Sequence, residues 1–294
     1  MTDISSAFSR CTSLTNVNIP ESVMDISYAF SGCTSLTHVD IPENVMDISY
    51  AFLNCTSLTH VDIPESVTDM SGAFSGCTSL TNVNIPENVT DLQGTFQGCT
   101  SLTHVDIPEN VRALEETFSG CTSLTHVNIP GSVTSLWGAF SGCTSLTHVD
   151  IPENVTSLQV TFQGCTSLTS VNFLGKSPLP LNKYGFNHTF IDCPNLQAIR
   201  FFSPTPLITN TYPGISNDVI VYIPKGSMSA YSATRWDDYN LVEFDATDID
   251  TPIRTDKAGA REHYSIDGKR LTAPQRGLNI IREADGTTKK IFIQ

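Results

Sequence analysis

Histidine and aspartate recur at a fixed spacing along the first half of this chain, and these are the side chains that could do chemistry. His38 and Asp40 lie two residues apart, and similar pairs return every 22 residues. Residues two apart on a strand face the same side, about 6–7 Å from each other. The candidate positions are His38, Asp40, His60, Asp62, Asn82, His104, Asp106, His126, Asn128, His148 and Asp150.

Metal binding is one chemistry that this pattern could support, because an imidazole beside a carboxylate can hold zinc or nickel. The alternative is a solvated polar surface whose pairs bind no ion. The repeat multiplies the same pair without making any one copy distinct. We therefore expect no resident metal and no cofactor. Metal capture by the repeated histidines and aspartates is kept as an alternative function.

Catalysis is disfavoured by where the nucleophiles should lie. The cysteines of the repeat are expected to face the core, whereas the histidines face outward. The sequence contains no Gly-rich phosphate loop, no G-x-S-x-G elbow and no H-E-x-x-H helix. Near-identical copies also offer no single place that differs, which an active site requires. The sequence predicts a protein that is not an enzyme.

The element that must position these side chains is a 22-residue unit. A constant period of this length is typical of a solenoid, in which each copy forms one coil stacked on its neighbours. Phe30, Leu36, Val39 and Ile41 have counterparts in nearly every copy. Eight cysteines mark the register without a slip: Cys11, Cys33, Cys55, Cys77, Cys99, Cys121, Cys143 and Cys165.

Each coil should contain one main strand, from Leu36 to Pro42 in the second copy. Alternation directs Val39 and Ile41 inward and the intervening polar residues outward. Proline lacks an N–H and ends the strand. Val45 and Ile48 should point inward from a second short extended segment, which leaves only short turns for the opposite side.

The cysteine ladder is predicted to be reduced. Equivalent residues on adjacent coils lie about 4.8 Å apart with parallel side chains, and a disulfide needs side chains that converge. We expect all eight cysteines to be small buried thiols that fill the core.

The spacing L-x-x-V-x-I-P, followed by A-F-x-x-C, resembles the BspA-like leucine-rich repeats of bacterial surface and secreted proteins. The resemblance covers about four-fifths of the chain. It implies a right-handed leucine-rich-repeat solenoid, a β-rich α/β fold with a parallel β-sheet on one face and short turns or helical turns on the other. It also implies adhesion to host matrix proteins or to other cells.

We predict four parts along the chain. Regular repeats occupy residues 1–173, and a degenerate repeat with a C-terminal cap occupies 174–245, where Tyr231 and Trp236 are large enough to close the core. Residues 246–262 are expected to form a linker. A small β appendage follows at 263–294, with hairpin turns at Asp267–Gly268 and Asp285–Gly286. This tail resembles the sorting modules of type IX secretion, and an appendage without a sorting role is the alternative.

Charge is placed unevenly. The net charge is −14, and residues 1–173 hold 17 acids and two bases, Arg10 and Arg112. Such a surface repels phosphate, so nucleic acid and anionic membranes are disfavoured as partners. The glutamates after the strand prolines form an acidic rim, which we interpret as a solvated edge: Glu21, Glu43, Glu65, Glu87, Glu109 and Glu153.

The sequence shows no signal peptide and no membrane span, and the chain opens inside a repeat. We expect a secreted or cell-surface bacterial protein without membrane insertion. Its sheet face should bind a host or bacterial surface protein or a glycan. A structural spacer without a ligand is the alternative from another functional class.

Overall fold

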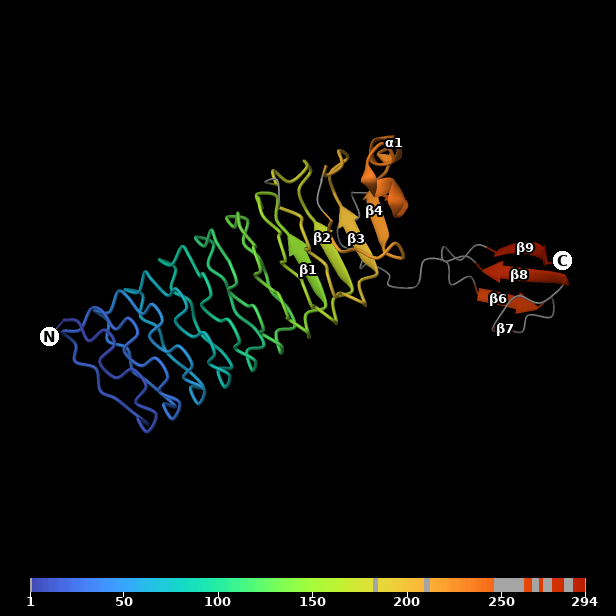
Figure 1. Ribbon diagram of the computed structural model, residues 1–294. Coiled ribbons are helices and arrows are strands. Elements are labelled where there is room, and N and C mark those ends of the chain that lie inside the picture. The colour runs from blue at the N-terminus through green and yellow to red at the C-terminus, as the bar shows by residue number, and fades with distance from the viewer. Residues whose placement is uncertain are drawn as a thin grey trace. The chain divides into compact units, whose positions relative to one another are not determined.

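The computed structural model describes residues 2–181, 185–208 and 212–245, and beyond them only the backbone of four strands between 262 and 293. The chain divides into two compact units, Met1–Thr247 and Asp248–Gln294. In the first unit the successive coils of the predicted solenoid stack in sequence order (Figure 1). The predicted solenoid fold is confirmed.

A column of phenylalanine rings forms the centre of the core. Each ring stacks on the ring of the next coil, with centroids 5.4 to 5.9 Å apart, and the rings from Phe30 onward are buried. The stack runs through Phe8, Phe30, Phe52, Phe74, Phe96, Phe118, Phe140, Phe162 and Phe190. A single 22-residue coil cannot enclose such a ring, so each coil depends on both neighbours.

The parallel sheet is regular only toward the C-terminal end of the solenoid. It comprises β1 (His148–Ile151), β2 (Ser170–Phe173), β3 (Ala198–Phe201), β4 (Ile220–Pro224) and β5 (Asn240–Phe244), in that order and all parallel. In earlier coils the predicted main strand is reduced to isolated bridges, such as Asn18 to Asp40 and Asp40 to Asp62. The expectation of a full strand from Leu36 to Pro42 was therefore too regular.

Hydrogen-bond lengths explain this difference. On the strand side, the Thr81 N–H donates to the Thr59 carbonyl at 3.4 Å, whereas the Thr169 N–H donates to Thr147 at 2.9 Å, where the sheet is regular. On the opposite side the coils are close, and the Phe30 N–H donates to the Ala51 carbonyl at 2.9 Å. The coils are therefore equally close on the turn side throughout, but the main strands of the early coils are too far apart to form a continuous ladder.

Polar side chains bridge adjacent coils at the turns after the strand prolines. Four asparagine amides donate to a backbone carbonyl of the preceding coil at 2.8 to 2.9 Å. These are Asn44, Asn88, Asn110 and Asn154. Each bond satisfies a carbonyl that no strand partner reaches, so the repeated asparagine has a structural role.

The C-terminal end of the solenoid is closed by α1 (Met228–Tyr231) and the short 3-10 helix η1 (Arg235–Asp238). Tyr231 and Trp236 are buried, as predicted. The Tyr231 hydroxyl donates to the Ser203 carbonyl at 2.9 Å, and the Trp236 indole N–H donates to the Leu207 carbonyl at 2.7 Å. Both rings therefore cover the apolar end with their own polar atoms hydrogen-bonded.

The second unit contains one antiparallel sheet in the order β7-β6-β8-β9. Its strands are β6 (Glu262–Ser265), β7 (Arg270–Leu271), β8 (Gly277–Arg282) and β9 (Thr288–Ile293). Glu262, the last residue of the predicted linker at 246–262, is the first residue of β6. The rest of that linker and both predicted Asp–Gly turns lie outside the described residues.

Candidate functional site

The sheet face, defined here by the eleven predicted positions from His38 to Asp150, points away from the core. Val39 and Ile41 are buried, whereas the side chains of His38 and Asp40 are 54% and 92% exposed. Alternation along each extended segment therefore places the polar residues as predicted. Their role in binding stays a prediction.

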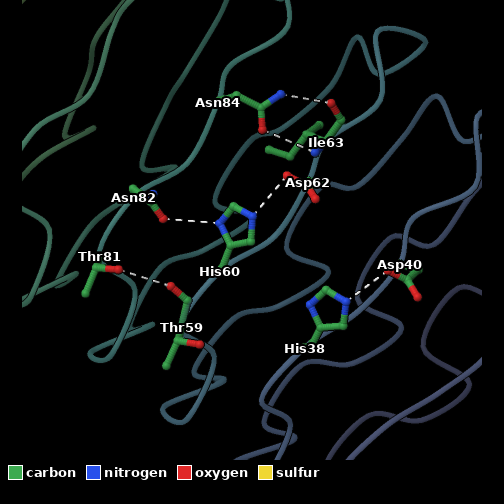
Figure 2. A network of polar contacts seen from close by, with 9 residues as sticks. All are labelled: His38, Asp40, Thr59, His60, Asp62, Ile63, Thr81, Asn82 and Asn84. Atoms are coloured by element: carbon green, nitrogen blue, oxygen red, sulfur yellow. Dashed lines mark hydrogen bonds and ion pairs between the residues drawn. The ribbon is translucent and has the colours of Figure 1, made fainter.

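Four histidines of the sheet face pair with the aspartate two residues later. Each Nε2 lies 2.9 to 3.0 Å from an Oδ1 atom, and two of these pairs are visible in Figure 2. The pairs are His38–Asp40, His60–Asp62, His104–Asp106 and His148–Asp150. The remaining histidine, His126, is followed by Asn128, which offers an amide in place of a carboxylate.

Contacts between coils hold two of these imidazoles from a second side. The Nδ1 atom of His60 lies 3.1 Å from the Asn82 Oδ1 atom, as Figure 2 shows. The Nδ1 atom of His148 lies 2.8 Å from the Ser170 hydroxyl. A ring bonded at both nitrogens has little freedom to rotate, so the repeat produces oriented imidazoles from short polar neighbours.

Asp150 is the least exposed carboxylate of these four pairs, and both His148 and Asn172 bond to it. The hydrogen bond from His148 holds the pKa of Asp150 below its usual value, and the Asn172 amide also donates to Asp150, at 2.9 Å. Burial opposes this shift only in part. Hydrogen bonds to the ionised form favour it, so Asp150 stays charged to lower pH than a free aspartate.

The geometry does not favour the metal-capture alternative. Each paired imidazole already directs Nε2 at the carboxylate of its own strand. Within the described ranges, no three His, Cys, Asp or Glu side chains converge as metal ligands would. A zinc site in a protein needs at least three such ligands.

The thiols of the cysteine ladder lie in the core, away from the histidines. From Cys33 to Cys165, each Sγ donates to a phenylalanine carbonyl of the preceding coil at 3.0 to 3.1 Å. Burial raises the pKa of the Cys121 thiol to about 12. A nucleophile needs the thiolate, so these cysteines are poor candidates for catalysis.

Cys11 departs from the prediction of eight buried thiols. It is exposed, although all nine cysteines are free. Cys33 is covered because the Phe8 carbonyl of the preceding coil accepts its hydrogen bond. Cys11 lies in the first coil that the structure describes and has no counterpart of this contact there.

Arg200 is a sheet-face residue that the sequence reasoning missed. The strand register aligns Asp150 with Asn172 and then with Arg200, so a cation ends the aspartate column. Its guanidinium lies 5.7 Å from the centre of the Tyr222 ring and 5.1 Å from that of Phe244. Burial lowers the pKa of Arg200.

The sequence contained a signal for this position of Arg200, since Ile199-Arg200-Phe201 repeats the pattern of Val149-Asp150-Ile151.

The comparison with protein families decides what this repeat is. The BspA type leucine rich repeat region, in six copies, matches residues 4–117 and 92–212. The chain belongs to this family. The BspA-type repeats therefore cover the coils that carry the sheet face, and the match indicates no enzymatic family.

Solved structures of leucine-rich repeat proteins resemble this chain. The T. pallidum leucine rich repeat protein is 34% identical over 49% of this chain and 71% of that one, with a TM-score of 0.45. A leucine rich cell surface protein from Faecalibacterium prausnitzii is 27% identical over 68% of this chain, with a TM-score of 0.48. This chain covers 62% of the F. prausnitzii protein.

A third similar structure is the pneumococcal vaccine antigen PcpA, which is 17% identical over 79% of this chain and 67% of that one, with a TM-score of 0.49. No curated protein matches this chain.

Among the described residues, no helix has both the length and the apolar character that crossing a membrane requires.

Proposed function

We propose that this BspA-type repeat protein is a non-enzymatic binding protein of the cell surface or the extracellular space, and that its sheet face recognises a protein or a glycan. The observation that carries the proposal is the set of four His–Asp pairs at 2.9 to 3.0 Å. The carboxylates of Asp40, Asp62 and Asp106 are 83 to 97% exposed. Fixed side chains lose less conformational entropy when a partner binds, so such a face suits recognition.

A structural spacer without a ligand is the competing function, and a binding experiment separates the two. The full chain is applied to an array of glycans and to a panel of purified extracellular-matrix proteins. The same screen is run with a variant that carries His60→Ala, His104→Ala and His126→Ala. We expect the wild-type chain to bind at least one probe and the triple variant to lose about tenfold or more in affinity.

The matched control replaces three exposed threonines outside the sheet face, Thr68→Ala, Thr90→Ala and Thr134→Ala. Both triple variants should keep the circular dichroism spectrum of the wild type, because all six side chains lie outside the core. Equal binding by the two variants would place recognition elsewhere on the molecule. Absence of binding to every probe would favour the spacer.

A further inference from the structure

The sheet face is interrupted at one coil. Where neighbouring coils carry histidine and aspartate, this coil carries Asn82 and Asn84. The Asn84 amide turns back to the preceding coil: its Nδ2 donates to the Ile63 carbonyl at 3.2 Å, and its Oδ1 accepts from the Ile63 N–H at 3.4 Å. Figure 2 shows both bonds. The side chain is therefore directed away from the following coil, where Asp106 lies.

An open hollow of about 420 Å³ occupies this place on the sheet face. Its walls include Asp62, Asn82, Asn84, Glu87, Asp106 and Ile107. Between His38 and Asp150, this is the one coil in which asparagine replaces both the histidine and the aspartate, and the hollow lies at this coil.

Apolar surface is available beside the carboxylates of this hollow. Ile107 is only partly buried, whereas its equivalents in the coils from Ile41 to Ile151 are 0 to 9% exposed. Pro108 lies next to it in the wall and is itself buried, so Ile107 supplies most of this apolar surface. A hydrocarbon stem laid here would remove the exposed surface of Ile107 from water, which favours association.

Three carboxylates surround this apolar wall. One oxygen of Asp62 and one of Asp106 each lie 3.0 Å from the Nε2 atom of the neighbouring histidine, and the two aspartate side chains are 83% and 97% exposed. Glu87 adds a third. The sequence contains no lysine or arginine between Arg10 and Arg112, so no basic side chain of that stretch neutralises the site.

We propose that the hollow binds a basic side chain, arginine or lysine, presented by an extended segment of a partner protein; this rests on the proposed function of the sheet face. The methylene stem lies against Ile107 and Pro108, and the cationic end is held among Asp62, Glu87 and Asp106. Long basic side chains combine an apolar stem with a charged head in this way. The lining contains no phenylalanine, tyrosine or tryptophan ring on which a sugar could stack, so a glycan fits the hollow less well.

The test uses a fluorescein-labelled peptide of alternating glycine and arginine, with citrulline and lysine versions. Fluorescence anisotropy measures binding to the full chain and to a variant with Asp62→Asn, Glu87→Gln and Asp106→Asn. We expect the arginine and lysine peptides to bind, the citrulline peptide to bind at least about tenfold more weakly, and the variant to lose about tenfold or more in affinity for the basic peptides.

The control variant removes three rim carboxylates outside the hollow, Glu21→Gln, Glu43→Gln and Glu153→Gln. It changes the net charge by the same amount and should alter affinity by no more than about twofold. If both variants lose the same affinity for the basic peptides, the effect is one of net charge and the proposal is overturned. The proposal is also overturned if the citrulline peptide binds as tightly as the arginine peptide. If the histidine variant loses recognition in the screen but the hollow variant does not, the sheet face functions without this site.

Discussion

At the scale of single residues, the repeat places thiols in the core and imidazoles on the surface. The thiols point inward and donate to carbonyls of the preceding coil, whereas the imidazoles point outward and meet carboxylates. The thiols and the His–Asp pairs recur with the same 22-residue period. The thiols are buried and the aspartates are exposed, so the chemistry of the two sets differs. Desolvation makes the thiolate unfavourable, and exposure leaves the aspartates charged and accessible.

The thiols should differ sharply in reactivity. Under native conditions, iodoacetamide should modify Cys11, which is exposed, and leave Cys33 through Cys165 largely unmodified, because they are buried and burial raises their pKa. Mass spectrometry after native and denaturing alkylation measures this difference. In denaturant without reductant every cysteine should be modified, and two stable bridges between coils would contradict the free-thiol assignment.

Asp150 offers a prediction on pH. The pKa of this carboxyl is lowered in the folded chain, chiefly by the hydrogen bond from His148, so Asp150 stabilises the fold above its unfolded pKa. That contribution is lost as the pH falls through the folded pKa. Carbon-detected NMR titration should show a pKa below the ordinary value of 3.8, and His148→Ala should move it upward. An unchanged pKa in this variant would show that another group holds the carboxylate.

At the scale of the coil, one turn position adopts a left-handed backbone in most copies. Glycine occupies it at Gly72, Gly94 and Gly138, where φ is 59 to 62°. Val160 occupies the same position with φ of 50°. A β-branched residue in this region is strained, because its Cβ approaches the following carbonyl oxygen. The coil therefore tolerates backbone strain at Val160, and packing against the neighbouring coils offsets it.

Val160→Gly should consequently stabilise the protein. Relief of backbone strain is worth about 1 kcal/mol or somewhat more in unfolding free energy, reduced by the greater freedom of glycine in the unfolded chain. Urea denaturation followed by circular dichroism measures the change. Gly94→Val is the matched control, since a Cβ there meets no atom within 4 Å, and it should destabilise by about 1–3 kcal/mol through strain alone. A loss of stability in Val160→Gly would show that the valine side chain contributes more than its strain costs.

At the scale of the whole solenoid, stability depends on having a neighbour on each side. Apart from Ile107, the interior side chains from Leu102 to Val127 are nearly fully buried, and Tyr231 and Trp236 cover the C-terminal end. In the first coil, Ile4, Phe8, Leu14 and Val17 are only partly buried. Repeat arrays gain stability from the interfaces between coils, so a coil with one interface is the weakest.

Amide hydrogen exchange should therefore be fastest in the first coil of this chain. We expect slow exchange between Leu102 and Ile129 and still slow exchange around Val221, which lies in a paired strand beneath the cap. Exchange measured by mass spectrometry on peptide fragments resolves these regions. Similar protection in the first and middle coils would indicate that another surface covers the N-terminal end, such as a second copy of the chain.

The sequence by itself determined the solenoid, the direction of each side chain and the aromatic closure at the C-terminal end. These follow from local rules: alternation along an extended segment fixes which residues face the core, and a period of 22 stacks equivalent residues such as Phe30 and Cys33. The placement of His38 and Asp40 on one exposed face could be predicted for the same reason.

Only the tertiary structure decided how the coils bond to one another. The early strands form isolated bridges because their inter-strand hydrogen bonds are longer than those of the regular sheet, 3.4 Å for Thr81 to Thr59 against 2.9 Å for Thr169 to Thr147. Differences of less than an ångström are not encoded in a repeat pattern. The hollow beside Asn84 likewise depends on which backbone its amide reaches, and the exposure of Cys11 depends on the absence of a covering coil. Local alternation fixes direction, whereas contacts between coils fix distance.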